Sequence, residues 1–190
     1  GLENYVVNEG LAYRLTPIRQ QDRNGGVDDN NMYTNVMTKF KFGGGEKPHV
    51  YFDENGRREL MSIRNAYSIL GNALASDGMR DSAQKVLNYG YQMINPTTLP
   101  YGMVSAGNME NITSLQYATA LYAAGDKQKA GVIANAVIRD CRQQLEYYKS
   151  LGEDAAAYFQ RDQQTAAGIM QQLEGMLKEM NAPPDRNKKP

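Results

Sequence analysis

The sequence predicts a mainly α fold, in which helical hairpins form an α-α superhelix behind a small N-terminal β element. Three observations predict it. From about residue 54 to residue 181, apolar residues recur at steps of three and four, the period of an amphipathic helix. Two segments of this region share one order of large, small and glycine residues. Near the N-terminus, short β-branched and aromatic runs flank the turn-like Asn8-Glu9-Gly10.

The first part of the chain predicts a β-hairpin followed by a loop. Residues 4–19 contain the two strand-like runs, and Asn8-Glu9-Gly10 is expected to join them. Residues 20–27, QQDRNGGV, are polar and glycine-containing, so we expect a loop there.

A short helix is expected next. Asp28 or Asp29 is its expected N-cap, because a carboxylate accepts hydrogen bonds from the free N–H groups of the first turn. Its apolar stripe consists of Met32, Tyr33, Val36, Met37 and Phe40. Gly43-Gly44-Gly45 is expected to end it, and Pro48–Phe52 to form a short extended segment.

The two similar segments are Arg64–Asn95 and Asn111–Arg142. Each carries a glycine followed five positions later by an alanine at the turn between its helices, at Gly78–Ala83 and Gly125–Ala130. This pattern resembles the tetratricopeptide repeat of about 34 residues. The two alanines are 47 positions apart, so about 13 extra residues, roughly Thr97–Met109, separate the copies. An ordinary helical bundle whose hairpins share turn residues is the alternative.

These patterns divide the chain into three parts. Residues 1–59 are expected to form an N-terminal β-hairpin plus helix cap, and residues 60–181 a tetratricopeptide-like helical domain. Within the latter, a long helix over about 153–181 is expected to cap the second hairpin, because repeats bury their faces against neighbours. Residues 182–190 lack periodicity and are expected to be a disordered tail.

Composition excludes several classes of protein. Lys plus Arg and Asp plus Glu both number 21, which leaves no basic surplus for nonspecific nucleic-acid binding. One Cys and one His exclude a disulfide framework and a Cys/His zinc site, and no cofactor is expected. No apolar run approaches the roughly 18 residues of a membrane span, so the fragment itself is not expected to insert. Because residue 1 is Gly rather than Met, we expect a piece of a longer protein.

Residues with possible catalytic chemistry are few. His49 lies beside Pro48 and is expected at the surface, and Cys141 lies on an apolar stripe and is expected to be a buried structural thiol. The pairs Asp28/Asp29 and Asp53/Glu54 could serve glycoside hydrolysis, but both precede helices, where capping explains them. Three tyrosines could belong either to a binding surface or to a seam between packed helices: Tyr147, Tyr148 and Tyr158.

Three strings of the chain resemble a bacterial protein family. They are LAYRLTPI at Leu11–Ile18, VDDNNMYTNVMTKFKFGG at Val27–Gly44 and VYFDENGRR at Val50–Arg58. They resemble the C-terminal soluble, tetratricopeptide-like region of multi-spanning membrane proteins similar to protein O-mannosyltransferases, long described as of unknown function. That family usually has Trp where this chain has Phe42. The resemblance implies that sugar transfer belongs to the membrane part and that this region lies on the periplasmic side of the inner membrane.

We therefore expect a noncatalytic module for protein–protein interaction or acceptor positioning. Its partner would be a protein or peptide, or its own membrane domain. Projecting the repeat pattern onto the chain predicts groove residues on the first helix of each hairpin: Asn65, Ser68, Asn72 and Ala75, then Thr119 and Tyr122. Asparagine amides can both donate to and accept from an extended backbone. A carbohydrate-active enzyme that uses the Asp/Glu pairs and a purely structural cap on the membrane domain are the alternatives.

Overall fold

The structure is a computed structural model that describes residues 2–20 and 26–182 of the 190-residue chain. It confirms the predicted fold class: helical hairpins make up most of the chain, and a three-stranded sheet lies near the N-terminus. Over the described residues, no helix combines the length and apolar character needed to cross a membrane. Residues 183–190, most of the expected tail, lie outside the described part.

The N-terminal hairpin forms as predicted. A 3-10 turn, Glu3–Tyr5, leads into β1, Val6–Asn8, which pairs antiparallel with β2, Tyr13–Leu15. The expected loop over 20–27 is wrong at its end, because Gly26–Val27 forms β3 and pairs parallel with β1. A two-residue strand has no periodicity, so only its pairing partner reveals it; residues 21–25 of that loop lie outside the described part.

The following helix begins at the predicted cap. The Asp28 side chain accepts a hydrogen bond from the Asn31 backbone N–H, and α1 spans Asp29–Thr34. A π-helical turn, Asn35–Lys39, continues it to its end, before the glycines expected to stop it.

The extended segment expected over Pro48–Phe52 begins as a turn at Pro48 and His49, and residues 50–52 after it belong to no helix, strand or turn. Among the described residues, no strand forms over Pro48–Phe52, and His49 has a φ of +58°. Tertiary hydrogen bonds hold this segment against the connection that follows the helix Arg80–Met93 (α3). The Asn95 N–H donates to the Gly45 carbonyl at 2.8 Å, and the His49 N–H donates to Thr97 Oγ1 at 3.2 Å.

The remaining chain is helical. Asp53 caps α2 by accepting from the Gly56 N–H. The helices are α2, Glu54–Ser76; α3, Arg80–Met93; α4, Met109–Ala123; α5, Lys127–Ser150; α6, Glu153–Ala157; and α7, Gln160–Asn181. A 3-10 turn, Ala106–Asn108, immediately precedes α4.

The expected single helix over 153–181 is broken into α6 and α7. The break falls at Tyr158 and Phe159, and the Phe159 ring stacks on Tyr148 of α5 with centroids 5.0 Å apart. The Gln163 side chain donates to the Ala156 carbonyl across the break at 2.9 Å. Packing against α5 thus interrupts a helix that sequence periodicity alone would continue.

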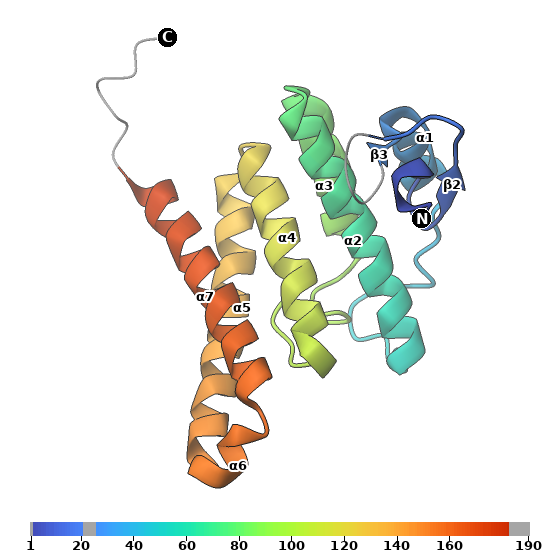
Figure 1. Ribbon diagram of the computed structural model, residues 1–190. Coiled ribbons are helices and arrows are strands. Elements are labelled where there is room, and N and C mark those ends of the chain that lie inside the picture. Colours follow the sequence, from blue (N-terminus) through green and yellow to red (C-terminus); the bar gives the residue numbers. More distant parts are fainter. Residues whose placement is uncertain (1, 21–25, 183–190) are drawn as a thin grey trace.

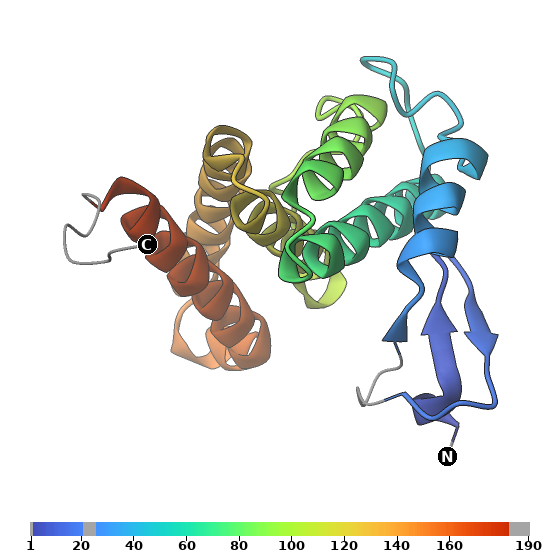
Figure 2. The same cartoon turned by 90° about the horizontal axis from the view of Figure 1, so that it is seen from above.

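Two antiparallel hairpins, α2/α3 and α4/α5, are stacked by the packing of α2 on α4 (Figure 1). Their turns carry the predicted glycines: Gly78 has φ +79° and Gly125 has φ +94°, values that favour glycine. Ala83 and Ala130 are fully buried where the second helix approaches the first. The final helix, α7, packs mainly on α5, so the helices follow a shallow arc from the N-terminal sheet to α7 (Figure 2).

One hydrophobic core joins the N-terminal part to the hairpins. It includes Met32, Val36 and Phe42 together with Tyr67 and Leu70 of α2. The Tyr67 hydroxyl donates to the Val36 carbonyl, and the Tyr67 ring lies 6.2 Å from that of Phe40. The boundary expected between residues 59 and 60 falls inside α2.

Candidate binding surface on the open faces of α2, α4 and α7

The open face of α4 carries a stripe of partly exposed, mostly apolar side chains. Its residues follow one another at steps of three and four, which places them on one side of the helix: Met109, Ile112, Leu115, Thr119 and Tyr122. The other side of α4 is buried in the core. Met109 is 50% exposed and Thr119 is also exposed, whereas Ile112, Leu115 and Tyr122 are partly buried against the core, so each of these three presents only part of its side chain to the surface.

The first of two hollows beside this stripe lies between α4 and α7. It has a volume of about 630 Å³, and we call it the α4–α7 hollow. Its lining residues are Leu115, Thr119 and Tyr122 from α4 and Gln171, Gln172, Gly175, Met176 and Glu179 from α7. At Gly175 an added Cβ would meet open space, so the hollow is deepened by a missing side chain. It stays open because α7 packs chiefly on α5 rather than α4.

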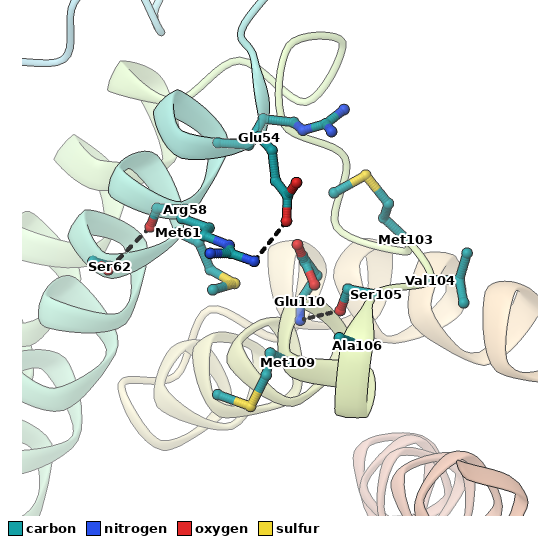
Figure 3. A pocket seen from close by; sticks show the side chains of 11 residues that line it. Glu54, Arg58, Met61, Ser62, Met103, Val104, Ser105, Ala106, Met109 and Glu110 are labelled. Atoms are coloured by element: carbon teal, nitrogen blue, oxygen red, sulfur yellow. Dashed lines mark hydrogen bonds and ion pairs between the residues drawn. The ribbon is translucent and has the colours of Figure 1, made fainter. Parts of the chain in front are cut away.

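The second hollow lies between α2 and the start of α4 and has a volume of about 640 Å³. We call it the α2–α4 cleft (Figure 3). Its lining residues are Glu54, Arg57, Arg58, Met61 and Ser62 from α2, Met103, Val104, Ser105 and Ala106 from the connection, and Met109 and Glu110 from α4. Within it, Arg58 Nη2 pairs with Glu54 Oε1 at 2.6 Å. Glu110 Oε2 is buried and has no hydrogen-bond partner among the described residues.

The structure separates the groove residues that the sequence predicts. Thr119 and Tyr122 lie together in the α4–α7 hollow. Ser68 is buried to 1% exposure and therefore lines no open surface. Asn65 and Asn72 are half-buried on α2 and line neither hollow.

Ala75, the last of the predicted first-hairpin residues, is also partly buried, and it packs against the core. The cleft residues Met61, Met103 and Glu110 were missed. The one available signal was the spacing of Met109 from Ile112 and Leu115, which extends the α4 stripe toward the cleft.

A buried arginine holds the wall of the α2–α4 cleft in place. Arg64 Nη2 donates to the Leu99 carbonyl at 2.6 Å, and Nη1 donates to the Pro100 carbonyl at 3.2 Å. Its guanidinium lies 4.3 Å from the centroid of the Tyr101 ring. Burial lowers the pKa of Arg64 and raises the pKa of Tyr101 to about 12. Arg64 thereby ties the connection between α3 and α4 to α2.

A second polar network holds the same connection to α4 and α5. The Met103 N–H donates to Asn111 Oδ1 at 3.2 Å, and Asn111 Nδ2 donates to Asp140 Oδ2 at 2.8 Å. Gln144 Nε2 donates to the same Asp140 oxygen at 2.7 Å. Asn111 is fully buried, so these bonds fix the backbone beside Met103 where it borders the cleft.

The two residues considered for nucleophilic or acid–base chemistry, His49 and Cys141, lie where the sequence predicts: one at the surface and one in the core. His49 is exposed on its turn. Cys141 is buried as predicted, and burial, followed by the nearby Asp140 carboxylate, raises the pKa of its thiol to about 11. A thiol with such a pKa is protonated at neutral pH and is a poor nucleophile.

Three carboxylates of the pairs considered for sugar chemistry cap a helix or form an ion pair with a nearby arginine. Asp28 caps α1 and also lies 3.0 Å from Arg14 Nη2, while Asp53 caps α2. Glu54 pairs with Arg58. No group of three or more His, Cys, Asp or Glu side chains able to hold a metal ion occurs in the described part of the chain.

Asp28 and Asp29 are expected to affect stability with opposite pH dependence. Hydrogen bonding from the Asn31 N–H is the largest contribution that lowers the pKa of Asp28, whereas burial, then the charge of Asp77, raises the pKa of Asp29. A lowered folded-state pKa contributes stability above the unfolded-state pKa, and that stability is lost as pH falls through the folded value. A raised folded-state pKa contributes stability below the unfolded-state pKa, and that stability is lost as pH rises through the folded-state pKa.

Asp29→Asn should therefore raise the Tm at pH 7, by the equivalent of less than about 1 kcal/mol, because Asp29 is only partly buried and solvent screens part of its interaction with Asp77. Asp28→Ala should lower the Tm at pH 7 and have less effect at pH 3. Thermal unfolding of both variants between pH 3 and pH 8 checks this. A lower Tm for Asp29→Asn at pH 7 would contradict the assigned repulsion.

Comparison of the chain with protein-family models, curated protein sequences and solved structures found no match.

Proposed function

We propose that this chain is a noncatalytic helical-repeat module that binds a protein segment along the open face of α4. The observation that supports this most is the apolar stripe of that face, which has a hollow on each side. An apolar centre with a polar rim is the usual composition of a protein-binding surface. Here the rim contains Gln171, Gln172 and Glu179 on one side and Glu54 and Arg58 on the other.

The hairpin arrangement supports the same proposal. We infer that α2/α3 and α4/α5 are tetratricopeptide-like repeats, because both copies have the glycine–alanine turn and because their first helices pack side by side. Stacked repeats of this kind form extended surfaces on which a peptide or a helix can lie. The resemblance to the mannosyltransferase-like family adds a location: an extracytoplasmic module on the periplasmic side of the inner membrane. Reading the gene upstream of residue 1 tests that location.

A photocrosslinking residue introduced at Thr119 tests the binding surface. The protein should be expressed in its native cell and within its full natural chain. We expect one discrete crosslinked species, either to another protein or within the longer chain, because Thr119 is exposed and lines the α4–α7 hollow. The same residue placed at Lys85, exposed on α3 and outside the surface, is the matched control.

A blocking substitution makes the test specific. Gly175→Phe should remove the Thr119 crosslink without destabilising the fold, because a side chain at Gly175 enters open space in the α4–α7 hollow. Equal crosslinking from Thr119 and Lys85, or a Thr119 crosslink that survives Gly175→Phe with the fold intact, would contradict the proposal.

A structural cap on a further domain is the second candidate, and one observation favours it. Large apolar residues are exposed on β2 and the residues beside it: Leu11 at 52%, Tyr13 at 60%, Leu15 at 60% and Ile18 at 71%. β2 is also an edge strand of the sheet. Exposed apolar residues on an edge strand are typical of a surface that packs against another domain. Tyr13→Lys should then weaken assembly of the full natural protein and leave the Tm of the isolated chain nearly unchanged.

A further inference from the structure

The α2–α4 cleft combines apolar walls with one carboxylate that lacks a partner. Met61 of α2, Met103 of the connection and Met109 of α4 lie around it, and Val104 beside them is 58% exposed (Figure 3). Thioether side chains are flexible and adapt to the shape of an apolar or aliphatic guest. The cleft can therefore surround a long aliphatic chain.

The charges of the cleft are unequally satisfied. Glu54 is neutralised by Arg58, whose Nη2 lies 2.6 Å from Glu54 Oε1. The other acid, Glu110, has a buried Oε2 that receives no hydrogen bond from any described residue. A buried carboxylate oxygen without a donor is costly, and a donor supplied by a ligand would remove that cost.

Arg64 carries a positive charge that acts on Glu110, but its N–H groups donate to other acceptors. These acceptors are the carbonyls of Leu99 and Pro100. Glu110 Oε2 therefore remains a free acceptor that is closed to solvent in the free chain, and a donor from outside reaches it when the flexible methionines of the cleft move aside.

We propose that the α2–α4 cleft receives a lysine side chain of the bound protein segment, and this inference rests on the proposed function. The aliphatic stem of the lysine lies between the methionines, and its ammonium group donates to Glu110 Oε2. Lysine suits this geometry because it carries a compact charge on a flexible four-carbon stem. Arg57 lines the same cleft and its charge opposes any cation there, so binding of the lysine depends on its hydrogen bond to Glu110 and on its contacts with the methionines.

Two peptides test the proposal on the full chain. They are acetyl-Ala-Leu-Lys-Leu-Ala-amide and its counterpart with norleucine in place of lysine, which keeps the stem and removes the ammonium. The chain, labelled with ¹³C at its methionine methyl groups, is titrated with each peptide and observed by NMR. We expect the lysine peptide to shift the Met61, Met103 and Met109 methyl signals in a saturable manner. The norleucine peptide should bind about 10- to 100-fold more weakly, the range for loss of one charged hydrogen bond.

Variants identify the carboxylate. Glu110→Gln should reduce the affinity for the lysine peptide about tenfold or more and bring it close to that of the norleucine peptide. Glu59→Gln, an exposed acid of α2 that does not line the cleft, should leave it unchanged. A methyl spectrum of free Glu110→Gln that matches the native one outside the cleft shows that the fold is retained. If it does not match, Met109→Lys provides the test, because its own ammonium should repel the lysine peptide.

Three results would overturn this inference: equal binding of the two peptides, unchanged affinity in Glu110→Gln, or no shift of the three cleft methionines. A shift of Met176 alone would place the peptide in the α4–α7 hollow. The lysine assignment would then fail while the proposed function stands. Failure of the Thr119 crosslink removes the proposed function whatever the peptides do.

Discussion

Arg64→Met is expected to lower the free energy of unfolding by about 2–4 kcal/mol. The substitution leaves the Leu99 and Pro100 carbonyls without their donor, and each unsatisfied buried acceptor costs about 1–3 kcal/mol. It also removes the cation–π contact with Tyr101, worth about 1–2 kcal/mol when desolvated. Relief from burying a charge offsets part of this loss. Urea denaturation followed by circular dichroism measures the difference.

The matched control is Arg58→Met on the same helix. Arg58 is exposed and, among the described residues, its one ion pair is with Glu54 one turn away, an interaction worth about 0.3–0.5 kcal/mol. In Arg64→Met we also expect the Met103 methyl signal to move, because the connection that carries it loses its anchor. Equal stability of the two variants would show that Arg64 does not hold the connection.

Tyr67→Ala is expected to cost about 3–5 kcal/mol, the range for removal of a large buried aromatic side chain. Tyr67 is fully buried and its ring contacts Phe40, Phe42 and Tyr89. Tyr67→Phe separates the hydroxyl from the ring, and loss of its hydrogen bond to the Val36 carbonyl should cost about 1 kcal/mol.

The Tyr67 variants also test whether the N-terminal part and the hairpins share one core. If they do, Tyr67→Ala should unfold in a single transition at lower urea, and amide protons of α1 and α2 should lose protection together. A variant that loses protection in α1 and keeps native protection in α2 would contradict a shared core.

Sequence patterns predicted the helices well because their signals are local. The caps Asp28 and Asp53 and the turn glycines Gly78 and Gly125 all lie where the structure has them. Features set by contacts distant in sequence could not be predicted in this way. The turn at His49 depends on Thr97, and the break at Phe159 depends on Tyr148.

The predicted groove residues overlap the proposed surface in part for the same reason. Thr119 and Tyr122 follow the period of α4 and line the α4–α7 hollow. Ser68 was expected to be accessible, but it lies one turn after Arg64 on the buried side of α2. The cleft was not predicted, because Met103 and its neighbours belong to the inserted connection, in which apolar residues do not recur at helical spacing.

In the native protein, we expect a bound segment to cover the open face of α4. Thiol labelling of Thr119→Cys measures this directly, since the natural Cys141 is buried and should react slowly. We expect a maleimide to label Thr119→Cys rapidly in the isolated chain and much more slowly in the native cell, while Lys85→Cys reacts alike in both settings. Equal labelling rates for Thr119→Cys in the two settings would contradict the claim.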